Sequence, residues 1–361
     1  MKKDSLQQVA YKRGFWASIS DFFYDLKVTL FPKRRQRSAR SYKAEAMVFV
    51  VALLAIPIIH WIIFWLYVNL QSISMAFTPP KGILPNVLAK MSWWEKVTYN
   101  YKSIYLNEIE PMINGTKSST LLVGFRNTFI YFGLHIFVTM PISLFIAFFI
   151  YKKILGYKIF RIIFYLPAVI PAIVLTSAFK GIVNANGPLV GLLDIKGADM
   201  EYVRTVGLLG TKETALITAI SYTLLTAYTK NVLLFSSGMA RIPTEVLEAA
   251  KLDGVGPGRE IISIVIPLIW PTFTTQFILA FTDMFSATGP IMLLTQGAND
   301  TYTFAFWMTS RIVGTSGTQI SDPNSEAVRH VSAMGIVTTI IALPIVYFAR
   351  WLCSKVDTVE Y

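Results

Sequence analysis

The stretch AMVFVVALLAIPIIHWIIFWLYVNLQSISMAFTPP, residues 46–80, contains no Asp, Glu, Lys or Arg. A helix crosses about 30 Å of hydrocarbon with roughly 20 apolar residues, because each residue rises 1.5 Å and the backbone groups are hydrogen-bonded within the segment. This stretch is therefore long enough for one complete span. Residues 127–151, 162–179 and 331–349 are also free of these four residue types. The sequence predicts a multi-pass membrane protein built from helices.

Two other apolar windows contain a single charged residue each. One extends from about Thr214 to Leu234 with Lys230 near its end, and the other from about Ile261 toward Leu294 with Asp283 in its middle. With the four uncharged stretches they give six predicted transmembrane helices and an all-α fold. We expect Lys230 to extend its amine to the membrane interface.

The composition excludes an ordinary soluble domain and most enzyme classes. Of the 361 residues 54% are hydrophobic and 15% are charged, whereas soluble domains average about 25% charged residues. Cys353 is the only cysteine, which excludes disulfide scaffolds and cysteine metal clusters. His60, His135 and His330 are spread over different segments, and no HExxH or GxSxG motif occurs. We predict no catalytic residue and no metal site, and interpret His60 and His135 as packing or hydrogen-bonding residues.

The distribution of cations predicts the topology. If the N-terminus is cytoplasmic, 21 of the 33 Lys and Arg residues lie on the cytoplasmic side. The positive-inside rule therefore places both termini on the cytoplasmic side of a bacterial cell membrane. Residues 1–45 form a basic arm, which we interpret as a helix on the inner membrane surface. A tail that only sets the topology is the alternative. We expect no nucleic-acid partner, because the aromatic residues of the arm lie on one helix face. Residues 351–361 form a cytoplasmic tail.

The longest polar stretch on the predicted outer side covers residues 80–122. It contains Trp93, Trp94 and Tyr99, aromatic residues of the kind that lie at membrane interfaces. We expect this segment to rest on the membrane or to cap a cavity, since it is too short for an independent domain.

One predicted cytoplasmic loop, about residues 237–262, includes Glu248-Ala-Ala-Lys-Leu-Asp-Gly254. Thr244 is expected to cap a short helix over 245–252, which Gly254 ends by taking a left-handed conformation. A helix of eight residues is unstable alone in water, so we expect it to pack against another surface. The spacing leaves open whether that surface belongs to this chain or to a partner.

This loop resembles the EAA signature of membrane subunits in binding-protein-dependent ABC importers: E-A-A, two residues, D-G, and then Ile266-Pro267. Weaker similarity covers most of residues 46–350 and points to the sugar and glycerol-phosphate class. The residues that resemble recurring positions of this class are 67–77, Asn127-Thr128, Phe160-Arg161 with Leu166-Pro167, and 294–297 with 301–303. The chain departs from the family where Gly297-Ala298-Asn299 replaces the usual Gly-Gly-Pro.

The resemblance implies the type I ABC importer permease fold and a set of partners. A second homologous permease subunit would complete the pathway, two cytoplasmic ABC ATPase subunits would use ATP and Mg, and an extracytoplasmic solute-binding protein would deliver the solute. Each EAA helix would sit in an ATPase cleft. There Glu248 would pair with a cation, Ala249 and Ala250 would permit close docking, Asp253 would brace the loop and Gly254 would make the turn. No G-x-x-x-x-G-K-[ST] phosphate loop occurs in the chain, so ATP hydrolysis needs another polypeptide.

Asp283 is the clearest candidate for the substrate pathway, because a carboxylate facing lipid costs about 2.5–3.5 kcal/mol. The neighbouring candidates are Gln276, Thr282, Phe281 and Phe285. Carboxylate and amide groups suit sugar hydroxyls, and aromatic rings suit the apolar faces of a sugar. The alternative is an interhelical hydrogen bond that holds the bundle together.

We therefore predict a permease subunit of an ATP-driven sugar importer. Glycerol phosphate or another small polar solute is the alternative within this class, and the scarcity of Lys and Arg in the spans favours a neutral sugar. An ion-coupled secondary transporter is a rival that would show inverted repeats and several intramembrane carboxylates. A membrane anchor or sensor would not account for six spans with polar positions inside them.

Overall fold

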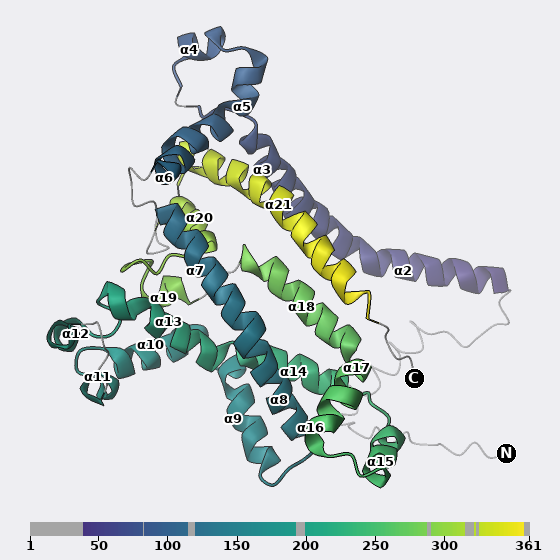
Figure 1. Cartoon of the computed structure of the whole chain (residues 1–361). Helices are drawn as coiled ribbons and strands as arrows, with labels where there is room; N and C mark the ends of the chain where they lie inside the picture. Colours follow the sequence, from purple (N-terminus) through teal and green to yellow (C-terminus); the bar gives the residue numbers. More distant parts are fainter. Residues whose placement is uncertain are drawn as a thin grey trace, which may run out of the picture. The chain divides into compact units, whose positions relative to one another are not determined.

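The computed structural model describes residues 39–81, 83–114, 120–192, 199–286, 290–314, 321–322 and 325–356. Every secondary-structure element within these ranges is helical (Figure 1). The chain forms two compact units, Met1–Asn69 and Leu70–Tyr361. The predicted basic arm falls mainly outside the described residues, since only residues 39–45 of it are described, as the start of the first helix.

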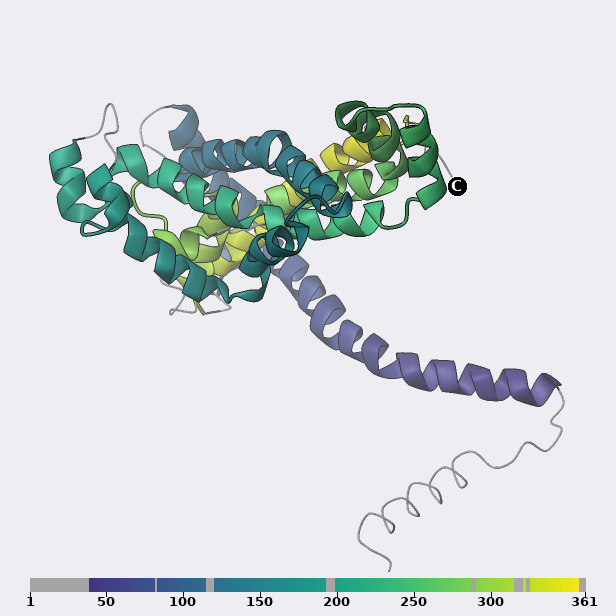
Figure 2. The same ribbon diagram turned by 90° about the horizontal axis from the view of Figure 1, so that it is seen from below.

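The first unit contains α2 (Ala39–Trp61) and the π-helical segment η1 (Ile62–Tyr67), which continue into α3 (Val68–Ala76) as one helix (Figure 2). The part from Ala46 to Ala76 is long and apolar enough to span a membrane. Large apolar side chains along it are exposed, including Met47 at 70% and Ile56 at 77%. A helix that is apolar on all sides requires lipid or another protein around it.

Two further helices have the length and composition of complete spans. One consists of α7 (Thr120–Leu134), η3 (His135–Thr139) and α8 (Met140–Tyr151), and the other is α21 (Glu326–Cys353). They match the predicted windows at residues 127–151 and 331–349. The predicted outer segment forms α4 (Pro85–Lys90), α5 (Trp93–Ile104), η2 (Tyr105–Ile109) and α6 (Glu110–Ile113).

Two of the predicted spans are sharply bent. The window at residues 162–179 forms α9 (Tyr157–Val169) and, after a bend of 104°, α10 (Ala172–Val183), which is followed by α11 (Pro188–Leu192). Ile170 is extended at the break, as expected for a residue before proline. The window from Ile261 forms α16 (Pro257–Glu260), η4 (Ile261–Val265) and α17 (Ile266–Leu268), then bends by 77° into α18 (Trp270–Met284). Pro271 has no N–H to bond the preceding turn, so the first helix cannot continue through it.

The extent predicted for the fifth window is wrong at its far end. Helix α18 ends at Met284 rather than continuing toward Leu294, and residues Ile291–Leu294 form a separate short helix, α19. Asp283 therefore lies in the last turn of α18 and not in the middle of a span. Phe285 is the C-cap residue at which α18 ends. Pro290, which directly precedes α19, has no backbone N–H to donate, so α18 cannot continue through it into α19.

The fourth window forms two helices, α13 (Lys212–Thr226) and α14 (Tyr228–Met239), which meet at Ala227. Among the described residues, three helices and the two bent pairs have the length and hydropathy of spans, giving up to five. A sixth span therefore stays a prediction. Helix α13 is rich in threonine, and Thr218, Thr223 and Thr226 each bond a carbonyl four residues earlier. Such internal bonds satisfy hydroxyl groups away from water.

The remaining helices are α12 (Met200–Val206), α15 (Thr244–Leu252) and α20 (Phe304–Val313). The largest core cluster joins α8, α14 and the segment around η4; its buried members include Met140, Leu144, Phe148, Phe235, Met239 and Val265. Helices α18 and α21 lie side by side (Figure 1), and Trp270 Nε1 donates to the Cys353 carbonyl at 3.1 Å.

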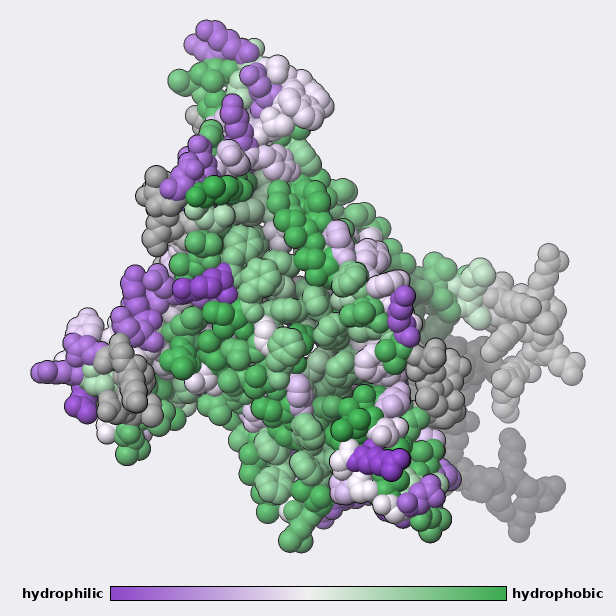
Figure 3. All heavy atoms as spheres, viewed as in Figure 1, coloured by the Kyte–Doolittle hydropathy of each residue, from purple (hydrophilic) through white to green (hydrophobic). Residues whose placement is uncertain are grey.

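The surface of the protein is divided into apolar and hydrophilic regions. On the face shown in Figure 3, apolar side chains cover the middle, and hydrophilic side chains gather over α4–α6, α11–α13 and α15–α16.

Two buried side chains secure the chain just after α3. The Asn100 amide on α5 donates to the carbonyls of Met75, Ala76 and Thr78 at 3.2, 3.0 and 2.9 Å. Arg329 on α21 donates to the Thr78 carbonyl at 3.0 Å. The last carbonyls of a helix have no partner within it. These contacts therefore join the end of α3 to α5 and α21.

Replacing Asn100 by Ala should lower the free energy of unfolding by about 1–3 kcal/mol, because buried carbonyls at the end of α3 lose their donor. Thermal unfolding of the detergent-solubilised protein checks this. Asn86→Ala, at an exposed position of α4, is the matched control and should change the melting temperature little. Equal melting temperatures for the two variants would contradict the capping role.

Candidate functional site

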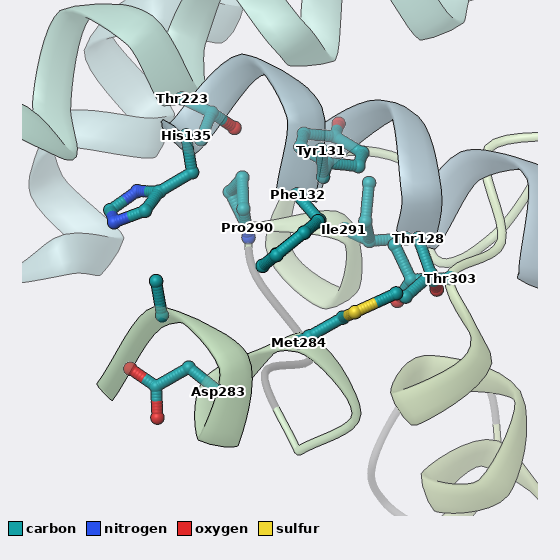
Figure 4. Close-up of a pocket in the computed structure, with 11 residues that line it drawn as sticks. Thr128, Tyr131, Phe132, His135, Thr223, Asp283, Met284, Pro290, Ile291 and Thr303 are labelled. Atoms are coloured by element: carbon teal, nitrogen blue, oxygen red, sulfur yellow. The ribbon is translucent and has the colours of Figure 1, made fainter. Parts of the chain in front are cut away.

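A cavity of about 190 Å³ lies among α7, η3, α13, α18 and α19 (Figure 4). The residues that line it are Thr128, Tyr131, Phe132, His135, Thr223, Ala280, Asp283, Met284, Pro290, Ile291 and Thr303. They combine aromatic rings and hydroxyl groups with one carboxylate and one imidazole. A few placed polar groups on an apolar wall are typical of small-molecule sites, and this mixture suits a solute with many hydroxyl groups.

Of the five residues predicted for the substrate pathway, only Asp283 lines this cavity. Thr282 is exposed, and its hydroxyl donates to the Ile278 carbonyl at 3.1 Å. Gln276 is buried at 5% exposure, and its amide nitrogen has no hydrogen-bond partner among the described residues. It lies seven residues before Asp283, which places it on the same helix face two turns away.

Of the two predicted aromatic residues, Phe281 contacts a residue that lines the cavity and Phe285 packs outside it. The Phe281 ring packs edge-on against Phe132, a lining residue, with centroids 4.7 Å apart. The Phe285 ring packs edge-on against Phe304 at 6.2 Å. Because Phe281 holds a ring that faces the cavity, its influence on a bound solute is indirect.

Sequence reasoning missed the contribution of the second predicted span. Thr128, Tyr131 and His135 lie at positions i, i+3 and i+7 of α7 and η3, so they share one face. His135, interpreted above as a packing or hydrogen-bonding residue, lines the same cavity as Asp283. The available signal was a stripe of polar side chains at helical spacing within the uncharged stretch 127–151.

One wall of the cavity is held by Asn127, which is fully buried. Its amide donates to the carbonyls of Asp300 and Tyr302, both at 2.7 Å. The adjacent Thr128 hydroxyl accepts a hydrogen bond from the Phe304 backbone N–H at 2.9 Å. These contacts fix the loop between α19 and α20 against α7, so the family-like positions 127–128 and 301–303 contact each other.

The loop itself is a tight structure. The hydroxyls of Thr295 and Thr301 lie 2.6 Å apart, and Asn299 donates to the Leu209 carbonyl at 2.8 Å. Gln296, Gly297, Asn299 and Asp300 all have positive φ, which is uncommon for residues other than glycine. The Gly297-Ala298-Asn299 departure from the family thus occupies a turn whose shape is set by these bonds.

Gly297→Ala should destabilise this loop by more than about 1 kcal/mol. Its φ is +80°, and an added Cβ would lie 2.6 Å from the Phe306 ring. Gly335→Ala is the control, because a Cβ there meets nothing within 4 Å and the site lies within α21. Thermal unfolding should show a lower melting temperature for the first variant and an unchanged or higher one for the second; the reverse order would contradict the strain.

The short helix predicted over residues 245–252 is present as α15, Thr244–Leu252. Thr244 is its first helical residue and not its cap: Pro243 occupies the N-cap position, and no side chain caps this end. The other end has the predicted form. Gly254 has φ +70°, its N–H donates to the Lys251 carbonyl, and the Val255 N–H donates to the Ala250 carbonyl. These two bonds form a Schellman motif, which satisfies carbonyls at the helix end.

The two alanines of α15 lie in different environments. Ala250 is buried at 6% exposure in this chain, whereas Ala249, Glu248, Asp253 and Gly254 are exposed. The two alanines therefore do not face one common open surface, since adjacent residues diverge by about 100° around a helix. Their role in close docking stays a prediction. Leu252 is 89% exposed and adds an apolar side chain to the open surface.

A buried ion pair joins this loop to the rest of the bundle. Lys152 Nζ, just after α8, lies 2.7 and 2.8 Å from the two carboxylate oxygens of Glu260 in α16. The Glu260 side chain is only 5% exposed. Removing one partner of a buried pair leaves an uncompensated charge. The pair therefore fixes the end of the loop to the end of α8.

Comparison with known proteins gives the following similarities. Residues 139–357 match the family model described as binding-protein-dependent transport system inner membrane component. The multiple sugar-binding transport system permease protein MsmF of Streptococcus mutans is 27% identical over 244 residues, which cover 68% of this chain and 77% of that protein. The diacetylchitobiose uptake system permease protein NgcF of Streptomyces coelicolor is 26% identical over 260 residues, covering 68% of this chain and 66% of that protein.

Two crystal structures share the fold. A chain of a bacterial ABC transporter involved in the import of the acidic polysaccharide alginate has a TM-score of 0.64 and 18% identity, covering 88% of this chain and 99% of its own length. The alginate transporter in complex with an alginate pentasaccharide-bound periplasmic protein gives 0.62 and 18%, covering 90% and 100%.

Proposed function

This chain belongs to the family of binding-protein-dependent transport system inner membrane components, and on that premise we propose that it is the permease subunit of an ATP-driven importer of a saccharide. A second homologous permease subunit completes the pathway in the bacterial cell membrane. Two cytoplasmic ATPase subunits bind ATP and Mg, and an extracytoplasmic solute-binding protein delivers the sugar. Both termini are cytoplasmic in this arrangement.

The observation that carries the proposal is the surface of α15. A short helix with exposed Glu248, Ala249 and Leu252 projects from a loop whose ends are firmly fixed. Ile242 is buried before the helix, and Glu260 is held by Lys152 after it. A helix anchored on one side and open on the other suits docking into a cleft of the ATPase. Glu248 pairs there with a cationic group, and Leu252 is buried by the contact.

The path from this surface to the cavity runs through α16, η4, α17 and α18. Val265 and Ile269, in the bent part of this segment, are packed in the core cluster with α8 and α14. Helix α18 then carries Asp283, at its far end, to the cavity. Because packed helices move as rigid elements, a displacement of α15 driven by closure of the ATPases reaches the cavity wall through this segment. That linkage supports alternating access.

The lining of the cavity supports a neutral saccharide. Among the described residues that line it there is no Lys or Arg, and Asp283 contributes negative charge. A phosphate or another acidic group would be repelled there, which disfavours glycerol phosphate, the alternative considered from the sequence. Asp283 and His135 in the lining offer polar groups for sugar hydroxyls, while Phe132 and Tyr131 offer apolar surface, which supports this proposal.

Glu248→Lys should weaken ATPase association and lower transport at least tenfold, because truncating or reversing one partner of an interfacial charge pair costs about 2–5 kcal/mol. Glu245→Lys is the control, since Glu245 is also exposed on α15, one turn earlier. Copurification of the ATPase and sugar-stimulated ATP hydrolysis in proteoliposomes are the measurements. Normal coupling in Glu248→Lys, or equal loss in both variants, would refute the specific docking role.

Asp283→Asn should weaken the apparent affinity for the transported sugar about tenfold, since a hydrogen bond to a charged group contributes roughly 1.5–3 kcal/mol. Uptake of a labelled sugar panel by proteoliposomes with the loaded binding protein measures this. Thr282→Val is the control, because Thr282 bonds its own helix and does not line the cavity. Loss of folded protein with unchanged selectivity would favour the structural alternative for Asp283.

A further inference from the structure

A second hollow, separate from the cavity described above, runs along α8 and α9 with a volume of about 180 Å³. Helix α8 contributes Ile146, Phe149 and Ile150, and α9 contributes Tyr157, Phe160 and Phe164. Phe149 is 47% exposed and Phe160 is 44% exposed. An apolar groove of this kind is unfavourable against water and requires an apolar occupant.

Cations gather at one end of this groove. The stretch from residue 152 to residue 161 contains four Lys and Arg residues and no acidic residue. Lys152 is engaged by Glu260, whereas Lys153, Lys158 and Arg161 are exposed and form no ion pair with any described residue. Arg161 lies one helical turn after Tyr157, so it borders the groove on α9.

We infer that this groove binds an anionic phospholipid. One acyl chain lies between α8 and α9, and the phosphate of the headgroup contacts Arg161 and Lys158. A phospholipid satisfies both observations at once, since it supplies apolar length and, at one end, a negative charge. An apolar transmembrane helix would fill the groove but leave the cations without a counter-charge. Basic pockets between membrane helices are suited to anionic headgroups.

Native mass spectrometry of the purified full chain tests this inference without any transport assay. The protein is titrated with phosphatidylglycerol and with phosphatidylcholine of the same acyl chains. We expect one phosphatidylglycerol to bind at least about tenfold more tightly. The double variant Lys158→Gln/Arg161→Gln should bind the two lipids about equally, because each cation near the membrane surface contributes about fivefold to the binding of an anionic lipid. Ile154→Trp, which places a larger side chain at the groove, should weaken the binding of both lipids alike.

Arg350→Gln is the matched control, because Arg350 is an exposed cation in the last turn of α21 and does not line the groove. It should keep the lipid preference. The inference is overturned if the double variant retains the preference or if the control loses as much. It is also overturned if a photoreactive phenylalanine at position 149 captures the second permease, and not lipid, in the assembled complex. The charge variants change exposed side chains only, so they test the site even if Ile154→Trp fails to fold.

Discussion

Hydrocarbon offers no hydrogen bonds to a backbone, and this constraint shapes the whole chain. Long helices satisfy it without help, as in Thr120–Tyr151 and Glu326–Cys353. Wherever a helix stops or bends, other parts of the protein must satisfy or cover the freed groups. Asn100 and Arg329 do so after α3, and Asn127 does so for the loop before α20.

The same breaks create the candidate site. Helix α18 ends at Met284, so Asp283 is presented at the end of a helix and not along the side of a continuous span. The loop held by Asn127 brings Thr303 against α7, where Thr128, Tyr131 and His135 share one face. A chain of unbroken spans would have no backbone irregularity with which to form this wall. Irregular backbone in a membrane protein is tolerated where it lines a cavity.

The loop around α15 shows how one short helix can serve two surfaces. Ala250 and the Lys152–Glu260 pair hold it to the bundle, and Glu248, Ala249 and Leu252 remain open. A helix held only by its chain ends could move while the rest of the bundle stays in place. The ion pair and the packed residues around η4 instead make the loop part of the bundle, as the proposed coupling role requires.

The sequence by itself determined the helical class, the membrane environment, the position of α15 and the left-handed turn at Gly254, because apolar length, absence of charge and glycine spacing are local properties. It did not determine the bends at Ile170 and Ile269, the early end of α18, or the burial of Ala250 beside an exposed Ala249. Only the tertiary structure decided these, and it alone brought His135 to the cavity of Asp283, since more than a hundred residues separate them in the chain. Contacts between residues so far apart in the chain depend on which faces of the helices meet. Several ways of packing the helices satisfy the same apolar pattern.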